Sequence, residues 1–341
     1  MISYNEKIYK LFYYWLLISL ILVLFIVVVG GLTRLTNSGL SITEWELFKG
    51  ILPPLNEETW LKYFSLYKEI PQYKLLNSMM TLQEFKIIFF WEYFHRILGR
   101  IIGLFFLIPL FYFYITKNID KSYINSCFIV MFLIIFQGLI GWYMVKSGLV
   151  NNVTVSHYRL SIHLCTAFII ASIIFWLLIQ VKNKSNFNFF SQNRISYFFY
   201  FLFSLLFIQI IMGAFVSGLD AGRIYQTWPL MGSSYFPNDF IFKHFIDLLS
   251  FKNHSLVQFY HRNIAYLITF SILILGYFIL RNKIDKVVKS YYLLMFFLVA
   301  QIILGIITLI SGLNIYLASL HQIFSLLLIL STINLYYRFI N

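Results

Sequence analysis

The amino-acid sequence predicts an all-α polytopic membrane protein, with eight transmembrane helices arranged as two parallel-repeat four-helix bundles. Three observations lead to this fold class. The chain is 60% hydrophobic and only 11% charged, with a mean hydropathy of +0.78, which is far from the balance of a soluble globular domain. Its apolar runs reach the length of about 20 residues that a helix needs to cross a bilayer. Its two halves also share short motifs.

The eight predicted spans follow one another along the whole chain. They cover residues 11–33, 86–115, 123–146, 160–181, 196–217, 258–280, 290–312 and 316–338. Lysine and arginine gather at every second boundary between them, at Lys7, Lys10, Lys117, Lys121, Lys182, Lys184, Arg194, Arg281, Lys283, Lys286, Lys289 and Arg338. Because short cytoplasmic loops carry such an excess, we predict that both termini are cytoplasmic and that the long loops 35–85 and 218–257 face outward.

The net charge of +13 does not predict a nucleic-acid partner, because its placement beside the spans explains it. We therefore expect a lipid bilayer as the surrounding and no nucleic acid. The short segment before the first span has neither a cleavable signal pattern nor an Arg- and Ser-rich transit peptide, which favours the bacterial plasma (inner) membrane. Cys127 and Cys165 both lie inside predicted spans, so we interpret them as small buried apolar residues and not as a disulfide or a thiolate ligand.

An internal repeat divides the chain into two halves. Residues 94–96 (FHR) return as 260–262 (YHR) at an offset of 166, and 161–163 (SIH) return as 319–321 (SLH) at an offset of 158. Because four spans restore the original direction, the halves are predicted to be parallel repeats, 1–190 and 191–341. A third match has a constant offset of 183 and pairs Gly30, Gly39 and Trp45 with Gly213, Gly222 and Trp228.

Four histidines occupy related places in this repeat. A single histidine on an apolar helix is usually a packing residue, but four at equivalent positions favour ligands of haem iron, for which imidazole is a standard ligand. No cysteine, carboxylate or third histidine accompanies either pair at ligand spacing, which disfavours copper or zinc. Each lies within about ten residues of the outer end of its span, so all four are expected in the outer half of the bilayer. They are His95, His163, His261 and His321.

Glu92 marks the position where the halves differ in chemistry. The offset of 166 aligns Glu92 with Gln258, so a carboxylate in the first half corresponds to an amide in the second. Glu92 and His95 are three residues apart and share a helix face. Two interpretations stay open: an ion pair with Arg96, Arg100 or Arg34, or a catalytic group beside a porphyrin that moves protons or stabilises positive charge. The second places the reaction in the first half and a fixed redox haem in the second.

The arginines close to the ligand candidates are candidates for binding haem propionates, because a guanidinium group matches a carboxylate with two hydrogen bonds. They are Arg96, Arg100 and Arg262, of which Arg96 and Arg262 each directly follow a ligand candidate. The three other histidines, at span ends or in outer loops, are interpreted as interfacial or solvated. They are His157, His244 and His254.

Together these motifs resemble the haem A synthase family over nearly the whole chain. The resemblance rests on residues 30–41, 45, 52–54, 84–86, 91–96 and 99–100 in the first half and on 213–222, 227–231 and 257–262 in the second. Some bacterial members carry a cysteine pair in the first outer loop. Residues 35–85 contain no cysteine, so the chain resembles the subclass of alphaproteobacteria and mitochondria.

The resemblance implies a function. It implies an oxidoreductase that converts the C8 methyl group of haem O to the formyl group of haem A for cytochrome oxidase. It assigns His95 and His163 to the iron of the substrate or product haem, His261 and His321 to the iron of haem b, and catalysis to Glu92. It implies haem O synthase and oxidase assembly factors as partners, and it leaves open whether the chain forms a homo-oligomer.

Two other functions fit parts of the sequence. A dihaem b-type transmembrane electron carrier would need the four histidines but not a carboxylate in one half alone, so Glu92 argues against it. A transporter would fit the parallel repeats. However, the spans lack clear signals for broken helices in mid-membrane, and the polar groups lie at one depth.

Overall fold

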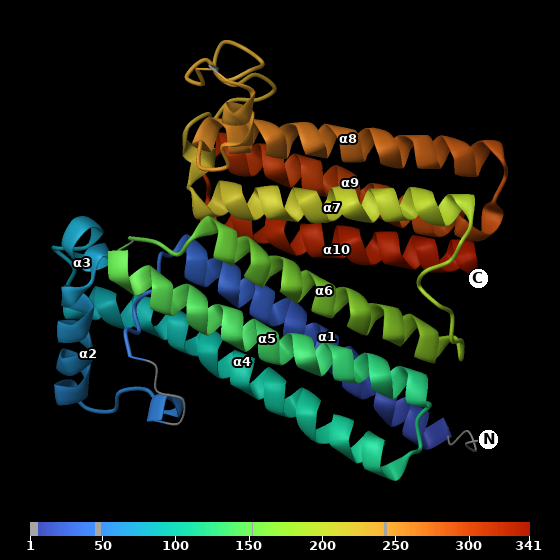
Figure 1. Ribbon diagram of the computed structural model, residues 1–341, viewed down its shortest axis with the longest axis horizontal. Coiled ribbons are helices and arrows are strands. Elements are labelled where there is room, and N and C mark those ends of the chain that lie inside the picture. The colour runs from blue at the N-terminus through green and yellow to red at the C-terminus, as the bar shows by residue number, and fades with distance from the viewer. Residues whose placement is uncertain (1–5, 45–48, 152, 242–243) are drawn as a thin grey trace. The chain divides into compact units, whose positions relative to one another are not determined.

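The computed structural model describes residues 6–44, 49–151, 153–241 and 244–341, and in this part of the chain every regular element is a helix (Figure 1). Trp45, which carries part of the predicted repeat, lies outside the described residues. The prediction of an all-α fold is confirmed.

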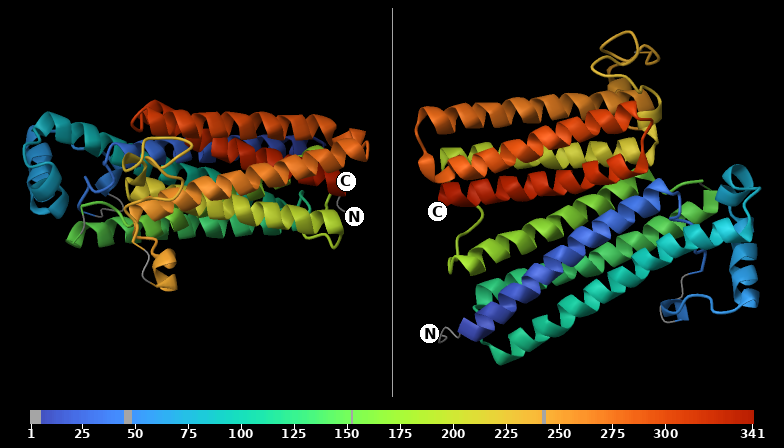
Figure 2. Two further views of the ribbon diagram at one scale, coloured as in Figure 1. Left: turned by 90° about the horizontal axis from the view of Figure 1, so that it is seen from above. Right: turned by 180° about the vertical axis from the view of Figure 1, so that it is seen from behind.

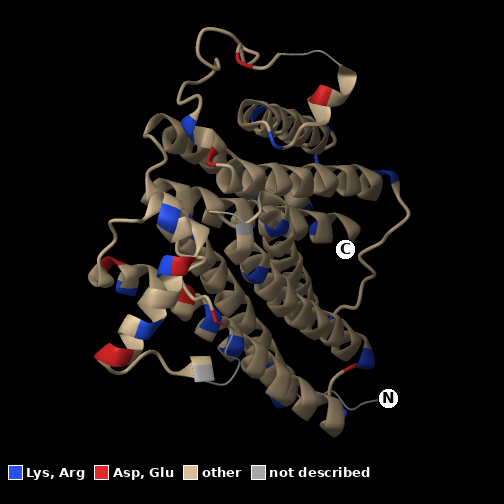
Figure 3. Ribbon diagram, turned by 60° about the vertical axis from the view of Figure 1, so that its left-hand side comes forward, with Lys and Arg blue, Asp and Glu red and all other residues tan. Residues whose placement is uncertain are grey.

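Among the described residues, eight long helices confirm the predicted spans. Each is long and apolar enough to cross a membrane, and Lys, Arg, Asp and Glu lie mainly at helix ends and in the loops (Figure 3). The chain is therefore a multi-pass membrane protein. The helices are α1 (Glu6–Leu35), α4 (Leu82–Thr116), α5 (Lys121–Asn151), α6 (His157–Lys182), α7 (Arg194–Gly218), α8 (His254–Arg281), α9 (Asp285–Ile310) and α10 (Ile315–Ile340).

Polar caps set several helix ends away from the limits of the apolar runs. The Thr81 hydroxyl accepts from the Glu84 N–H while the Glu84 carboxylate accepts from the Thr81 N–H, a capping box that starts α4 at Leu82. His95 therefore lies 13 residues into its helix, deeper than its predicted distance from the outer end. α9 ends at Ile310, before the predicted 312, because Gly312 takes φ +73°.

The chain divides into two compact units, Met1–Ile174 and Phe175–Asn341. Within the first, α1 packs on α4 and α4 on α5; within the second, α7 packs on α8 and on α10, and α9 packs on α8 and on α10 (Figures 1 and 2). α6 contains the division between the units. The boundary between 190 and 191 and the repeat relation of the two halves stay predictions.

The long loops contain short helices that the hydropathy pattern did not predict. In the first loop, Asn56 caps α2 (Glu57–Glu69) with its side chain, and Pro71 opens α3 (Pro71–Leu76) at a position that needs no N–H. The remaining elements are 3₁₀ turns: η1 (Lys49–Ile51), η2 (Ala221–Arg223) and η3 (Phe245–Leu249).

The two cysteines are free. Cys127 is buried as predicted, whereas Cys165 is partly exposed, so the prediction of burial is wrong for Cys165.

Candidate functional site

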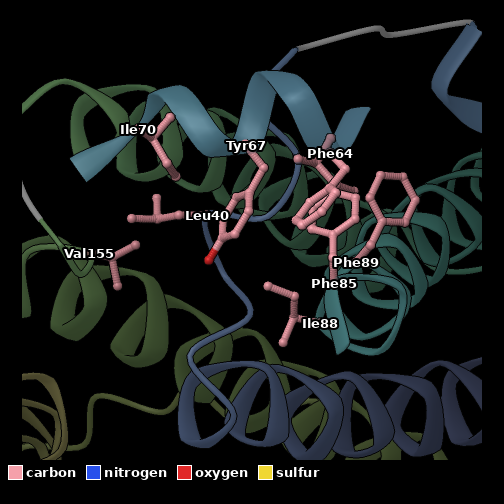
Figure 4. Packing of buried hydrophobic residues seen from close by; sticks show 9 residues of the cluster. Leu40, Phe64, Tyr67, Ile70, Phe85, Ile88, Phe89 and Val155 are labelled. Atoms are coloured by element: carbon pink, nitrogen blue, oxygen red, sulfur yellow. The ribbon is translucent and has the colours of Figure 1, made fainter. Parts of the chain in front are cut away.

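A hydrophobic cluster fixes the first long loop, between α1 and α4, against the N-terminal end of α4. In Figure 4, Tyr67 points from α2 toward Leu40, and Phe64 points from the same helix toward Phe85. Because these side chains leave water together, the loop residues that precede Trp45 are held close to α4. The buried members of the cluster are Leu40, Ile42, Phe64, Tyr67, Ile70, Phe85, Ile88, Phe89 and Val155.

Hydrogen bonds also hold the first long loop in this position. The Tyr67 hydroxyl donates to Gln72 Oε1 at 3.0 Å and accepts from Asn77 Nδ2 at 2.7 Å. Gln72 Nε2 in turn donates to the Asn37 carbonyl at 3.1 Å. Burial raises the pKa of Tyr67 above its ordinary value, so the hydroxyl keeps its proton and remains a donor.

The first long loop places two hydrogen-bond donors beside Glu92, the buried carboxylate of α4. Glu92 Oε2 accepts from the Ser41 hydroxyl at 2.7 Å and from the Ile42 N–H at 2.8 Å. Glu92 Oε1 accepts from Arg96 Nη2 at 2.6 Å and from Arg96 Nε at 3.2 Å. The Glu92 side chain is only 4% exposed, and it is the only buried acidic residue among the described residues. Of the ion-pair partners that the sequence suggests, the structure therefore selects Arg96.

Gln258 in α8 corresponds to Glu92 in the repeat, but it donates a hydrogen bond to the loop where Glu92 accepts two. It is also buried, and its Nε2 donates to the Tyr225 carbonyl at 2.9 Å. Arg262 Nη2 donates to the same carbonyl at 3.1 Å, just as Arg96 Nη2 donates to the Ile42 carbonyl at 3.1 Å. Ile42 and Tyr225 are separated by the offset of 183 found in the sequence. In both units an arginine therefore donates to a loop carbonyl in the same way. The carboxylate of Glu92 distinguishes the site in the first unit from the site in the second.

His95 and His163 come together in the first unit. Their ring centroids are 6.3 Å apart. A metal–imidazole bond of about 2.0–2.1 Å puts a ring centre roughly 3.2 Å from the metal, so this separation fits two imidazoles on opposite sides of one metal ion. Nδ1 of each ring is buried and has no hydrogen-bond partner among the described residues. An orphaned ring nitrogen of this kind fits a ligand that still has to be oriented by its bound metal.

His261 and His321 have the same character in the second unit. Nδ1 of each is buried without a partner in the described chain. A glutamine amide nitrogen faces Nε2 of each ring, at 3.4 Å from Gln209 to His261 and at 3.3 Å from Gln301 to His321. Both amide oxygens are also buried and unpartnered within the described residues. These unsatisfied groups mark a buried polar space that fits a haem.

The predicted propionate ligands lie beside these sites. Arg262 donates to carbonyls of the loop at Tyr225 and Leu230, and its Nε is buried without a partner among the described residues. Arg96 is already bound to Glu92. Arg100 reaches the Gly50 carbonyl at 3.1 Å and therefore ties η1 to α4.

The comparison with known proteins identifies the family. The family model described as cytochrome oxidase assembly protein, COX15-CtaA, matches residues 13–333. The chain is a member of the COX15-CtaA family. It is 48% identical over 328 residues to a protein of Pelagibacter ubique named Heme A synthase, with 95% of each chain covered. Proteins with the same name in Rickettsia felis and Bartonella henselae are 42% and 41% identical, covering 92% and 90% of this chain and 94% and 86% of theirs.

This COX15-CtaA protein also contains contacts that the sequence analysis missed. Ser41 and the Ile42 N–H were not expected at Glu92, because only loop closure brings them there. Gln137 Nε2 donates to the His163 carbonyl at 2.8 Å. The glutamines beside the histidines leave a signal in the sequence, since Gln137, Gln209 and Gln301 each lie four residues before a glycine.

Proposed function

We propose that this chain is a haem A synthase, an oxidoreductase that converts the C8 methyl group of haem O to a formyl group in two successive oxidations. The names of relatives that cover nearly the full chain support this activity, as does membership of a cytochrome oxidase assembly family. The observation that carries the proposal is a pair of histidine rings with buried Nδ1 atoms in the same unit as the only buried acidic residue of the described chain.

We assign the substrate to the first unit. His95 and His163 hold the iron of haem O, and Glu92 lies on the helix that carries His95. In the two oxidations the methyl carbon loses four electrons to an external electron acceptor and gains one oxygen atom from a small co-substrate, and it becomes electron-poor as the electrons leave. A carboxylate that is already oriented by fixed donors stabilises that positive charge without reorganising during the reaction. Ser41, Ile42 and Arg96 are those donors.

We assign haem b to the second unit, where His261 and His321 would hold its iron. When bound, haem b carries single electrons. Arg262 pairs with a propionate, which its unpartnered Nε supports. Arg96 has the equivalent position beside the substrate and divides its hydrogen bonds between Glu92 and the Ile42 carbonyl.

The charge pattern and the apolar helices support the following proposed setting. The protein lies in the bacterial plasma membrane with both termini in the cytoplasm, so that both sites open toward the outer loops. It receives haem O from a haem O synthase, and oxidase assembly factors receive haem A.

Pigment extraction tests the activity. Haem extracted from the purified protein is separated by chromatography and compared with standards of haem b, haem O and haem A. The proposal expects haem O or haem A beside haem b. Haem b alone, at two per chain, would instead identify a dihaem electron carrier.

A further inference from the structure

Each ligand histidine lies against a glycine of the preceding transmembrane helix. A Cβ atom added to any of these glycines would come within 3.3 Å of Cε1 of the facing imidazole. The pairs are Gly30 of α1 with His95, Gly141 of α5 with His163, Gly213 of α7 with His261, and Gly305 of α9 with His321.

The approach is closest in two of the pairs, and at Gly305 it is too close for a larger residue unless the imidazole shifts. The added Cβ would lie 2.8 Å from His321 Cε1 at Gly305 and 3.0 Å from His95 Cε1 at Gly30. At Gly213 and Gly141 the distances are 3.2 and 3.3 Å, so the ring would need to give by a few tenths of an ångström. Carbon atoms in van der Waals contact lie about 3.5–4.0 Å apart.

Among the described glycines, these four meet an imidazole, whereas a Cβ atom added at Gly148, Gly222 or Gly276 would meet the side chain of Leu40, Leu313 or Tyr291. Gly138 lies on α5 only three residues before Gly141, and an added Cβ there would meet nothing within 4 Å. Gly103 on α4 also has nothing within 4 Å. Close packing of helices by small residues is common in membranes, but here the atom that fills the space above each glycine belongs to an imidazole and not to the facing backbone.

The histidine rings need such a support because no hydrogen bond to Nδ1 within the described chain orients them, and the glutamine contacts of His261 and His321 reach only Nε2. Nδ1 is buried and unpartnered in all four rings among the described residues. A ligand ring is normally fixed by a hydrogen bond from its second nitrogen. In these four rings, packing against the glycine takes the place of that hydrogen bond, because the space beside the glycine admits the ring in one orientation.

We propose that Gly30, Gly141, Gly213 and Gly305 are positioning residues that set the orientation of the four imidazoles toward the haem irons. This inference rests on the proposed function, because it assumes that the histidines bind haem. It assigns the glycines a role in ligand geometry beyond helix packing.

The test uses the full-length protein with its haem b and does not depend on turnover. The variants are Gly305→Ala and Gly213→Ala, with Gly138→Ala and Gly103→Ala as controls and His321→Ala as the ligand variant. The readouts are haem b per protein and the low-spin paramagnetic resonance signal, whose highest g value depends on the angle between the two imidazole planes.

Gly305→Ala is expected to lose the low-spin haem b signal or to shift its highest g value, and Gly213→Ala to shift it less while keeping the haem. The milder Gly213→Ala keeps the test valid if Gly305→Ala does not fold. Both controls are expected to match the wild-type protein. Unchanged signals in Gly305→Ala and Gly213→Ala, with loss of the signal in His321→Ala, would overturn the positioning role. An unchanged signal in His321→Ala would instead overturn the haem b site itself.

Discussion

Replacing Arg96 with glutamine is expected to destabilise the protein because it leaves the Glu92 carboxylate buried without its cation. Glu92 accepts two hydrogen bonds from Arg96, at 2.6 and 3.2 Å, and its side chain is only 4% exposed. Removing one partner of a buried ion pair costs about 3–5 kcal/mol. Arg96→Gln should lower the free energy of unfolding by this amount.

The same change should cost less when Glu92 is already glutamine. Arg96 then loses chiefly its hydrogen bond to the Ile42 carbonyl, and a hydrogen bond of a charged group contributes about 1.5–3 kcal/mol. A double-mutant cycle of Arg96→Gln and Glu92→Gln should therefore give a coupling energy of roughly 1.5–2 kcal/mol.

Titration with sodium dodecyl sulfate in mixed micelles measures the four free energies of unfolding. The control cycle combines Glu92→Gln with Arg262→Gln, which has no shared partner and should be additive within about 0.5 kcal/mol. Equal coupling in both cycles would refute the ion pair as the group that balances the buried carboxylate.

Three further outcomes follow from the structure. Ala substitution of both His261 and His321 should remove the low-spin haem b spectrum from the purified protein, and a normal spectrum would exclude them as ligands. Burial acts to raise the pKa of Asp239, but hydrogen bonds from Ser255 and Tyr225 hold it below its ordinary 3.8; its contribution to loop stability is thus present above that value and lost as pH falls through the lowered pKa. As the pH falls through the lowered pKa, protease resistance of the loop 219–253 should drop in the wild-type protein but not in Asp239→Asn. Identical pH profiles of the two proteins would contradict this. Single cysteines at 117–121 or 282–289 should resist impermeant thiol reagents in intact cells, whereas labelling from outside would invert the topology.

Hydropathy was sufficient to predict the eight spanning helices of the described residues, because a spanning segment must satisfy its backbone hydrogen bonds internally and expose apolar side chains to lipid. It could not predict the start of α4, which the capping box at Thr81 determines. Nor could it predict α2, whose stability comes from packing Tyr67 and Phe64 into a cluster formed by distant residues.

The candidate site was predictable only as far as its repeat. The four histidines and the contrast between Glu92 and Gln258 are visible in the sequence, and the structure adds their surroundings. Ser41 reaches Glu92 across 51 positions of sequence, a contact that depends on how the loop closes. The sequence contains the glycines that face the imidazoles, but their proposed role depends on interatomic distances that cannot be predicted from sequence spacing.

The haem content of Glu92→Gln tests the central claim most directly. Gln258 in the second unit indicates that an amide fits the corresponding buried position, so this variant is expected to fold and to carry haem. Loss of a catalytic proton or charge contact costs about 10²–10⁴ in rate. Chromatography of haem extracted from the variant should therefore show haem O or a hydroxylated intermediate, with little haem A. Haem A at the wild-type level would contradict a catalytic role for Glu92 and leave its carboxylate as a structural partner of Arg96.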